Sequence, residues 1–274
     1  MVRLLIAILF SSCNYNNPYP KAAITSIADE KELLDNSSFD SNTKTIHVLV
    51  ALCDNKYQGI VPVPAKIGNG QDPANNLYWG CAYGIRSYFK NSSKWQLLKR
   101  FSIDSVKMER VVFKHKVSGY YLVADAYNGK NIKDCTVDFL QSCSGKMKDS
   151  LNVNGTSIGI NGNAMLLSYI GHDGLMDFKL TEKFINTDGR SRDAIILACY
   201  SKNYFAPYLQ QTRTRPLVWS THLMSPEAYT LHDAIESYIK KEPAENIRSS
   251  AAKAYSKYQK CSEKAAKGLL VFGY

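Results

Sequence analysis

A histidine and a cysteine each stand just beyond a short apolar run of this chain. Residues 164–170 are followed by Gly171 and His172, and residues 194–198 are followed by Cys199. Short, continuous aliphatic runs predict strands that are buried on both faces of a parallel sheet. Reactive side chains collect at the carboxyl ends of such strands. We therefore expect a thiol nucleophile and an imidazole base to meet at one edge of a sheet.

The rest of the chain alternates between predicted strands and helices. We expect strands at 45–52, 110–113, 120–124, 216–220 and 269–272, and helices at 72–89, 131–142, 180–185, 227–240 and 244–267. This alternation predicts an α/β protein, a three-layer α/β/α sandwich with a mostly parallel sheet. A length of 274 residues is sufficient for one such domain with appended tails.

Composition limits the chemistry and the partners of the protein. The chain has 34 Lys and Arg against 24 Asp and Glu, and the net charge of +10 permits an acidic partner. None of the seven cysteines forms a C-x-x-C pair, which argues against a zinc ribbon or a thioredoxin-type site. His222 and His232 lack the spacing of zinc ligands, and we interpret them as scattered surface residues. We expect no cofactor and no metal.

The N-terminus has the parts of an export signal. A positive start at residues 1–3 precedes an apolar core at residues 4–10, and Ser-Ser-Cys13 follows. The segment resembles a bacterial lipoprotein signal, with Cys13 as the lipidated residue. This resemblance implies a lipid anchor at the bacterial cell envelope. The alternative is a buried N-terminal strand in a cytoplasmic protein with Cys13 unmodified.

The order of elements over residues 45–225 resembles the caspase/gingipain-like cysteine peptidases (clan CD). In that group one hydrophobic strand ends in His-Gly and the next ends in Cys. The resemblance implies a caspase-like sheet and a peptide or protein substrate, with His172 as general acid/base and Cys199 as nucleophile. It also implies an oxyanion hole formed by the backbone N–H groups of Cys199 and Gly174. In this chain Asp173 stands between His172 and that glycine.

The same resemblance suggests a substrate-binding residue. Asp54 follows the first strand, where several families of the clan have a residue of the S1 pocket. An aspartate there would favour Lys or Arg at the cleaved position. The other interpretation of Asp54 is a loop residue that caps a turn.

Two other functions remain open. A catalytically degenerate member of the same fold would act as a binding or scaffold lipoprotein. A serine hydrolase would use Ser157, which lies in a G-x-S-x-G pattern at residues 155–159. That motif needs a strand before it and a helix after it. Its Asn-rich flanks predict a polar loop instead.

The C-terminal region carries a periodic row of lysines. Lys253, Lys257, Lys260, Lys264 and Lys267 recur at intervals of four and three residues. On one helix they would share a face and could bind an anionic surface, or they could form a solvated face. We expect no nucleic-acid partner. The predicted organisation is a signal peptide at 1–13, a tether at 14–44, a caspase-like α/β domain at 45–242 and a C-terminal part at 243–274 packed on that domain.

Overall fold

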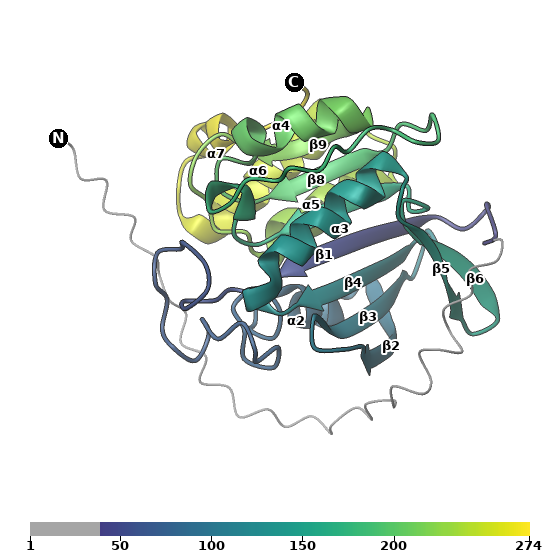
Figure 1. Cartoon of the computed structure of the whole chain (residues 1–274), viewed down its shortest axis with the longest axis horizontal. Helices are drawn as coiled ribbons and strands as arrows, with labels where there is room; N and C mark the ends of the chain where they lie inside the picture. Colours follow the sequence, from purple (N-terminus) through teal and green to yellow (C-terminus); the bar gives the residue numbers. More distant parts are fainter. Residues whose placement is uncertain (1–38) are drawn as a thin grey trace.

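Eight strands form one mixed, mostly parallel sheet in the computed structural model, which describes residues 39–274 (Figure 1). The strands are β1 (Thr45–Ala51), β2 (Trp95–Ser102), β3 (Lys107–His115), β4 (Tyr121–Tyr127), β7 (Leu166–Ile170), β8 (Asp193–Leu197), β9 (Arg215–Ser220) and β10 (Leu270–Val271). Their order is β10-β9-β8-β7-β1-β4-β3-β2. The five strands from β9 to β4 run parallel, whereas β10, β3 and β2 are antiparallel to their neighbours. The protein is therefore α/β, as the alternation of apolar runs predicts.

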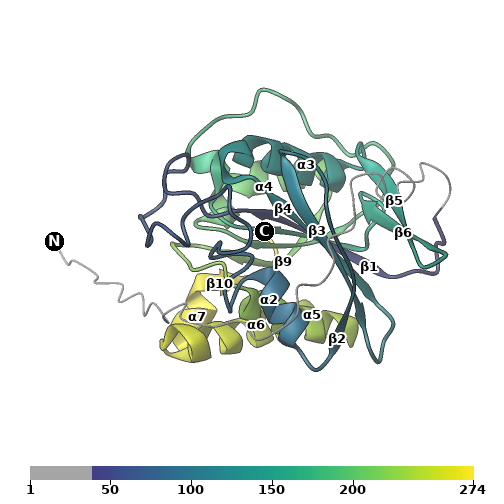
Figure 2. The ribbon, with the colours of Figure 1, turned by 90° about the horizontal axis from the view of Figure 1, so that it is seen from below.

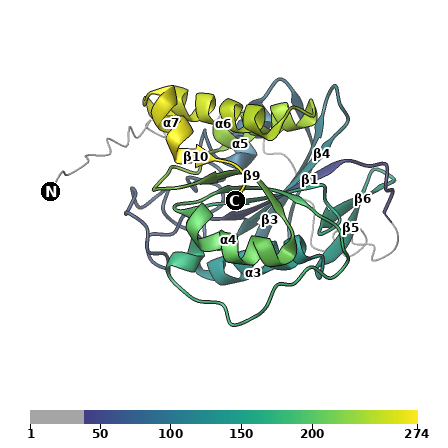
Figure 3. The same cartoon turned by 90° about the horizontal axis from the view of Figure 1, so that it is seen from above.

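Helices lie on both faces of this sheet. They are α2 (Ile85–Asn91), α3 (Ile132–Ser144), α4 (Ser201–Thr212), α5 (Ala228–Ile239), α6 (Ala244–Gln259) and α7 (Glu263–Leu269). Figures 2 and 3 show α3 and α4 on one face, with α5, α6 and α7 on the other. Alternate residues of β1 enter the two hydrophobic cores: Val48 and Val50 pack on the α5–α6 side, and Leu49 on the α3–α4 side. Burial on both faces explains why β1 is apolar from Val48 to Ala51.

A small hairpin covers the outer part of the sheet. Its strands are β5 (Lys148–Val153) and β6 (Thr156–Asn161), joined by a turn in which Asn154 and Gly155 both have positive φ. Ser157 lies within β6 opposite Asn152, so the expectation of a loop at this position is wrong. The strand is not followed by a helix, and Ser157 therefore lacks the strand–turn–helix geometry of a serine nucleophile.

The predicted helix at 72–89 is wrong over most of its length. Only α2, at its end, is helical, and the residues before it form a series of turns. The Asn76 side chain accepts hydrogen bonds from the backbone N–H groups of Cys53 and Tyr78, and it donates to the carbonyl of Cys53. Such side-chain bonds to the backbone compete with the helical ladder, which explains the turns.

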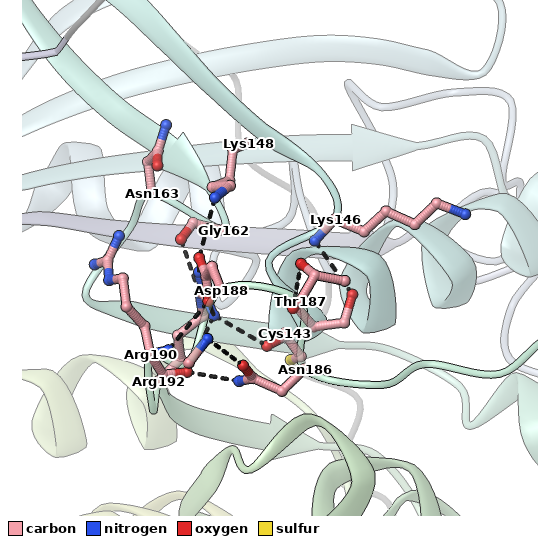
Figure 4. Close-up of polar contacts among 12 residues, drawn as sticks. Cys143, Lys146, Lys148, Gly162, Asn163, Asn186, Thr187, Asp188, Arg190 and Arg192 are labelled. Atoms are coloured by element: carbon pink, nitrogen blue, oxygen red, sulfur yellow. Dashed lines mark hydrogen bonds and ion pairs between the residues drawn. The ribbon is translucent and has the colours of Figure 1, made fainter.

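The connection from β7 to β8 has no helix at 180–185, in contrast to the prediction. Its only helical part is the 3₁₀ turn η2 (Gly174–Met176). Figure 4 shows what holds the later part in place of a helix. The buried Arg192 guanidinium binds the Asp188 carboxylate through Nη1 at 3.1 Å and Nη2 at 2.5 Å, and its Nε donates to the Gly162 carbonyl. The pKa of Asp188 is held below its usual range, chiefly by the Arg192 hydrogen bond acting against burial.

The predicted C-terminal helix is broken into two. Lys260 has φ 55°, α6 ends before it, and the Ser262 hydroxyl caps α7 by accepting from the N–H of Ala265. The five lysines at 253–267 are exposed, but they stand on two helices and the turn between them, so the prediction of one continuous helical face is wrong. β10 pairs with β9 at the end of this region. Within residues 39–274, no helix combines the length and the apolar character needed to span a membrane.

Candidate functional site

The segments that follow β7 and β8 both leave the sheet at its carboxyl edge. The two strands are parallel neighbours, with Ile170 opposite Leu197, so the prediction that these strands lie side by side is confirmed. His172 and Cys199 each follow two residues after this pair. Gly171 has φ 138°, and a Cβ there would lie 2.5 Å from the carbonyl oxygen of Ala51. A glycine is therefore needed to lead the chain from β7 into the histidine turn.

His172 is held by a carboxylate that the sequence pattern did not single out. Its Nε2 lies 2.8 Å from Oδ2 of Asp177, and the residue is only 5% exposed. Asp177 also accepts the backbone N–H of Gly59 at 3.0 Å, which joins the β1 loop to the histidine turn. Among the described residues, Nδ1 of His172 has no hydrogen-bond partner. With Nε2–H donating to Asp177, Nδ1 retains a lone pair that can accept a proton.

Cys199 lies on a sharp turn from β8 into α4. Tyr200, the next residue, has φ 51° and ψ 24°, and its N–H donates to the carbonyl of His222 at 3.0 Å. The Cys199 thiol is partly buried and contacts the backbone of Met224 on both sides. Sγ lies 3.4 Å from the Met224 nitrogen, which donates to it, and 3.6 Å from the Met224 oxygen.

The Cys199 thiol is neutral in this state. Burial raises its pKa, the hydrogen bond from Met224 opposes that effect in part, and the charge of Asp173 adds to it. A reactive thiolate requires a change in the surroundings of Cys199.

Asp173 is a buried carboxyl group inside the site. It has no exposed surface, its Oδ1 accepts the N–H of Leu175 at 3.0 Å, and its Oδ2 has no partner among the described residues. Burial raises the pKa of Asp173 to about 7, and the nearby charge of Asp177 adds to this effect. Asp173 therefore changes its charge close to neutral pH, beside the cysteine whose ionisation it opposes.

Replacing Asp173 with asparagine is expected to flatten the pH dependence of stability. The folded protein keeps this proton up to about pH 7, whereas the unfolded chain releases it near pH ~4. In this window the unfolded state binds fewer protons, so the wild-type free energy of unfolding falls as pH rises, by about 2–4 kcal/mol. Urea unfolding at both ends of the window measures the difference. The exposed Asp134→Asn serves as the control, and an unchanged slope in Asp173→Asn would contradict the assignment.

Gly174 does not stand where the family resemblance implies an oxyanion donor. It is buried at the start of η2, and the nearby Tyr169 hydroxyl donates to the carbonyl of His172 at 2.8 Å. A Cβ at Gly174 would also lie 2.7 Å from the ring of Phe178. The inserted Asp173 moves this glycine into the start of η2, away from the position directly after the histidine.

Asp54 does not present its carboxylate to a substrate. It is 1% exposed, and its Oδ1 accepts the backbone N–H groups of Lys56 and Tyr57. Its Oδ2 accepts from the Gln71 side chain at 2.6 Å. The role in an S1 pocket is therefore corrected to the other interpretation, a loop residue that caps a turn.

His222 and His232 are not both surface residues, in contrast to the prediction. His222 is exposed, and its ring lies 5.8 Å from that of Tyr200, next to the candidate site. His232 is buried, with Nε2 3.0 Å from the Ser92 hydroxyl. No group of metal-binding side chains occurs among residues 39–274.

A pocket of about 330 Å³ lies at the opposite edge of the sheet, near the start of β7, β8 and β9. It is lined by Ala164, Met165, Arg190, Ser191, Arg192, Asp193, Arg215 and Tyr238. Two of its arginines already form ion pairs: Arg192 binds Asp188, and Arg215 binds Asp193 at 2.7 Å. This pocket is remote from His172 and Cys199, which follow the other ends of β7 and β8.

Comparisons of the chain with protein-family models, with curated proteins and with solved structures found no match. The functional argument therefore depends on the residues at the carboxyl edge of the sheet.

Proposed function

We propose that this protein is a cysteine hydrolase of the peptidase type, with Cys199 as nucleophile and His172 as base. The observation that carries the proposal is the His172–Asp177 pair at 2.8 Å, at the end of the strand next to the one that precedes Cys199. A base that is oriented by a third group, close to a nucleophile, is the common pattern of covalent hydrolysis. Asp177 takes the part of the orienting group.

The chemistry follows from these roles. Nδ1 of His172 takes the proton from Cys199, and the thiolate attacks the carbonyl carbon of the substrate. His172 then gives that proton to the leaving nitrogen as the bond to carbon breaks, which leaves a thioester on Cys199. Water attacks the thioester while His172 takes one of its protons, and His172 returns that proton to the Cys199 sulfur as the carbon–sulfur bond breaks, which releases the acid and restores the free thiol. This sequence needs no cofactor or metal.

The proposal includes a caspase-like, three-layer fold and a peptide or protein substrate. In its support, helices lie on both faces of a mostly parallel sheet, and the histidine and cysteine follow neighbouring strands in the order implied by the resemblance. We further propose export and a lipid anchor through Cys13, which lies outside the described residues, as does most of the tether. An anionic surface in contact with the exposed lysines at 253–267 is part of the same proposal.

A binding or scaffold protein of the same fold is the second candidate. Two observations favour it: Gly174 is buried at the start of η2, and the pKa of the Cys199 thiol is raised. A serine hydrolase has no such support, because Ser157 lies inside a hairpin strand.

Covalent labelling distinguishes the two candidates. We expect peptidyl acyloxymethyl ketones with varied residues at the cleaved position to modify Cys199, as located by peptide mass spectrometry. His172→Gln should slow this labelling at least about 100-fold, and Asp177→Asn about tenfold, because the base is lost in the first and only its orientation in the second. His232→Gln is the matched control and should leave the rate unchanged. Labelling that does not depend on His172 would support the scaffold instead.

A further inference from the structure

The segment between β9 and α5, residues 221–227, lies against the nucleophile turn. Met224 contacts the thiol of Cys199 through both its backbone N–H and its carbonyl, at 3.4 and 3.6 Å. His222 accepts the N–H of Tyr200 at 3.0 Å. The loop thus binds two consecutive residues of the turn that carries the candidate nucleophile.

The loop is itself anchored by the C-terminal helices. The N–H of Ser225 donates to the Tyr255 hydroxyl on α6 at 3.3 Å. At the other end, the N–H of Thr221 donates to the carbonyl of Leu269 at 2.9 Å, and its hydroxyl donates to that of Gly268 at 3.0 Å. Each anchor is a single neutral hydrogen bond, partly buried at Tyr255 and exposed at Gly268. Contacts of this kind stabilise a loop by about 0.5–1.5 kcal/mol each, so they can open without unfolding the protein.

We infer that residues 221–227 form a latch that keeps Cys199 latent, and that the latch must open before the thiol can attack a substrate. While the latch is closed, the Cys199 S–H donates to the Met224 carbonyl, and its proton is therefore committed to the loop. Burial raises the pKa of the thiol, and the hydrogen bond from the Met224 N–H opposes this effect only in part. When the loop withdraws, the N–H and carbonyl of Met224 lose their partner and become available to a peptide backbone.

The latch accounts for features that otherwise oppose catalysis. A neutral thiol in the resting state protects an exported protein and its neighbours from premature cleavage and from oxidation. The anchors at Tyr255 and Leu269 place control of the site in α6 and α7, which carry the exposed lysines at 253–267. The inference rests on the proposed function for its meaning, because a latch matters only where Cys199 reacts.

The test measures the rate at which iodoacetamide alkylates Cys199 in the folded, full-length protein. Tyr255→Phe removes the acceptor of the Ser225 N–H, and Thr221→Val removes the hydroxyl bound to Gly268. Each should raise the rate about tenfold, the equivalent of about 1.4 kcal/mol in the opening equilibrium. Tyr258→Phe, the same change on α6 at a hydroxyl that contacts Tyr88 instead, should leave the rate unchanged.

Cys261 provides an internal reference, because it is a half-buried thiol whose alkylation should be equal in all four proteins. Equal rates at Cys199 in wild type and in both latch variants would overturn the latch, as would a wild-type rate as high as that of Cys261. Suppose that Cys199 is alkylated faster in the latch variants but that labelling by the peptide ketones does not depend on His172. This result would support the latch and contradict the proposed hydrolase function.

Discussion

Replacing Cys199 with alanine is expected to reduce peptide hydrolysis to the background rate, a loss of at least about 10³-fold in kcat/KM. The side chain forms the covalent bond in the proposed reaction. Hydrolysis of a fluorogenic peptide library, with a latch variant such as Tyr255→Phe as the starting protein, measures the effect.

The matched control is Cys261→Ala, which removes the other partly exposed thiol of the described residues. It should leave the rate unchanged. Activity that survives in Cys199→Ala would place the nucleophile elsewhere and would exclude the proposed mechanism. Activity lost equally in both variants would indicate damage to the fold, which thermal unfolding of each variant checks directly.

Replacing Asp125 with alanine is expected to lower the free energy of unfolding by about 3–5 kcal/mol. Asp125 on β4 accepts two hydrogen bonds from Arg110 at 2.6 and 2.8 Å and lies 3.1 Å from Nε2 of His47. All three side chains are buried beneath the β5–β6 hairpin, and His47 also accepts the N–H of Asn161 from that hairpin. Loss of the carboxylate removes the counter-ion that binds this buried guanidinium through two hydrogen bonds.

The Asp125 carboxylate also makes the free energy of unfolding depend on pH in the acidic range. Burial acts to raise the pKa of Asp125, but Arg110 and His47 outweigh it and hold the pKa far below its usual range. A depressed pKa in the folded state gives stability that is present above about pH 4 and is lost as the pH falls below it. Urea unfolding of wild type and Asp125→Ala should therefore converge toward low pH.

Arg248→Gln is the control for this experiment, because it breaks an exposed ion pair with Glu245 on α6. Surface pairs contribute little to stability, so this variant should unfold like the wild type at each pH. A loss in Asp125→Ala no larger than that in Arg248→Gln would show that the buried triad does not stabilise the fold.

The strands that carry His172 and Cys199 could be predicted from the sequence, because local pattern decides them. Both runs are rich in apolar residues and have no polar alternation, which is typical of an inner parallel strand buried on both faces. The pairing of Ile170 with Leu197 confirms that the two strands are neighbours. The helices at 131–142 and 227–240 were predictable for the same kind of reason, a sustained helical period.

The local sequence pattern predicted the wrong structure where a polar side chain binds a residue that is distant in sequence. Asp72 and the residues after it favour a helix by type, yet the Asn76 amide, bonded to the backbone of Cys53 across 23 positions, holds turns there. The positive φ of Lys260 ends α6, and the chain turns there into α7, which is followed by β10 paired with β9. Helical propensity is a weak preference, and tertiary contacts override it.

The state of the site was decided only by the tertiary structure. The carboxylate of Asp177 is five residues from His172 and could have been noticed as a partner, but its bond to Gly59 spans 118 positions. Met224 reaches Cys199 across 25 positions and leaves no trace in the residue pattern around the cysteine. Burial and contact between distant segments set the charge of Cys199 and Asp173, because the pKa of a group depends on what surrounds it in space.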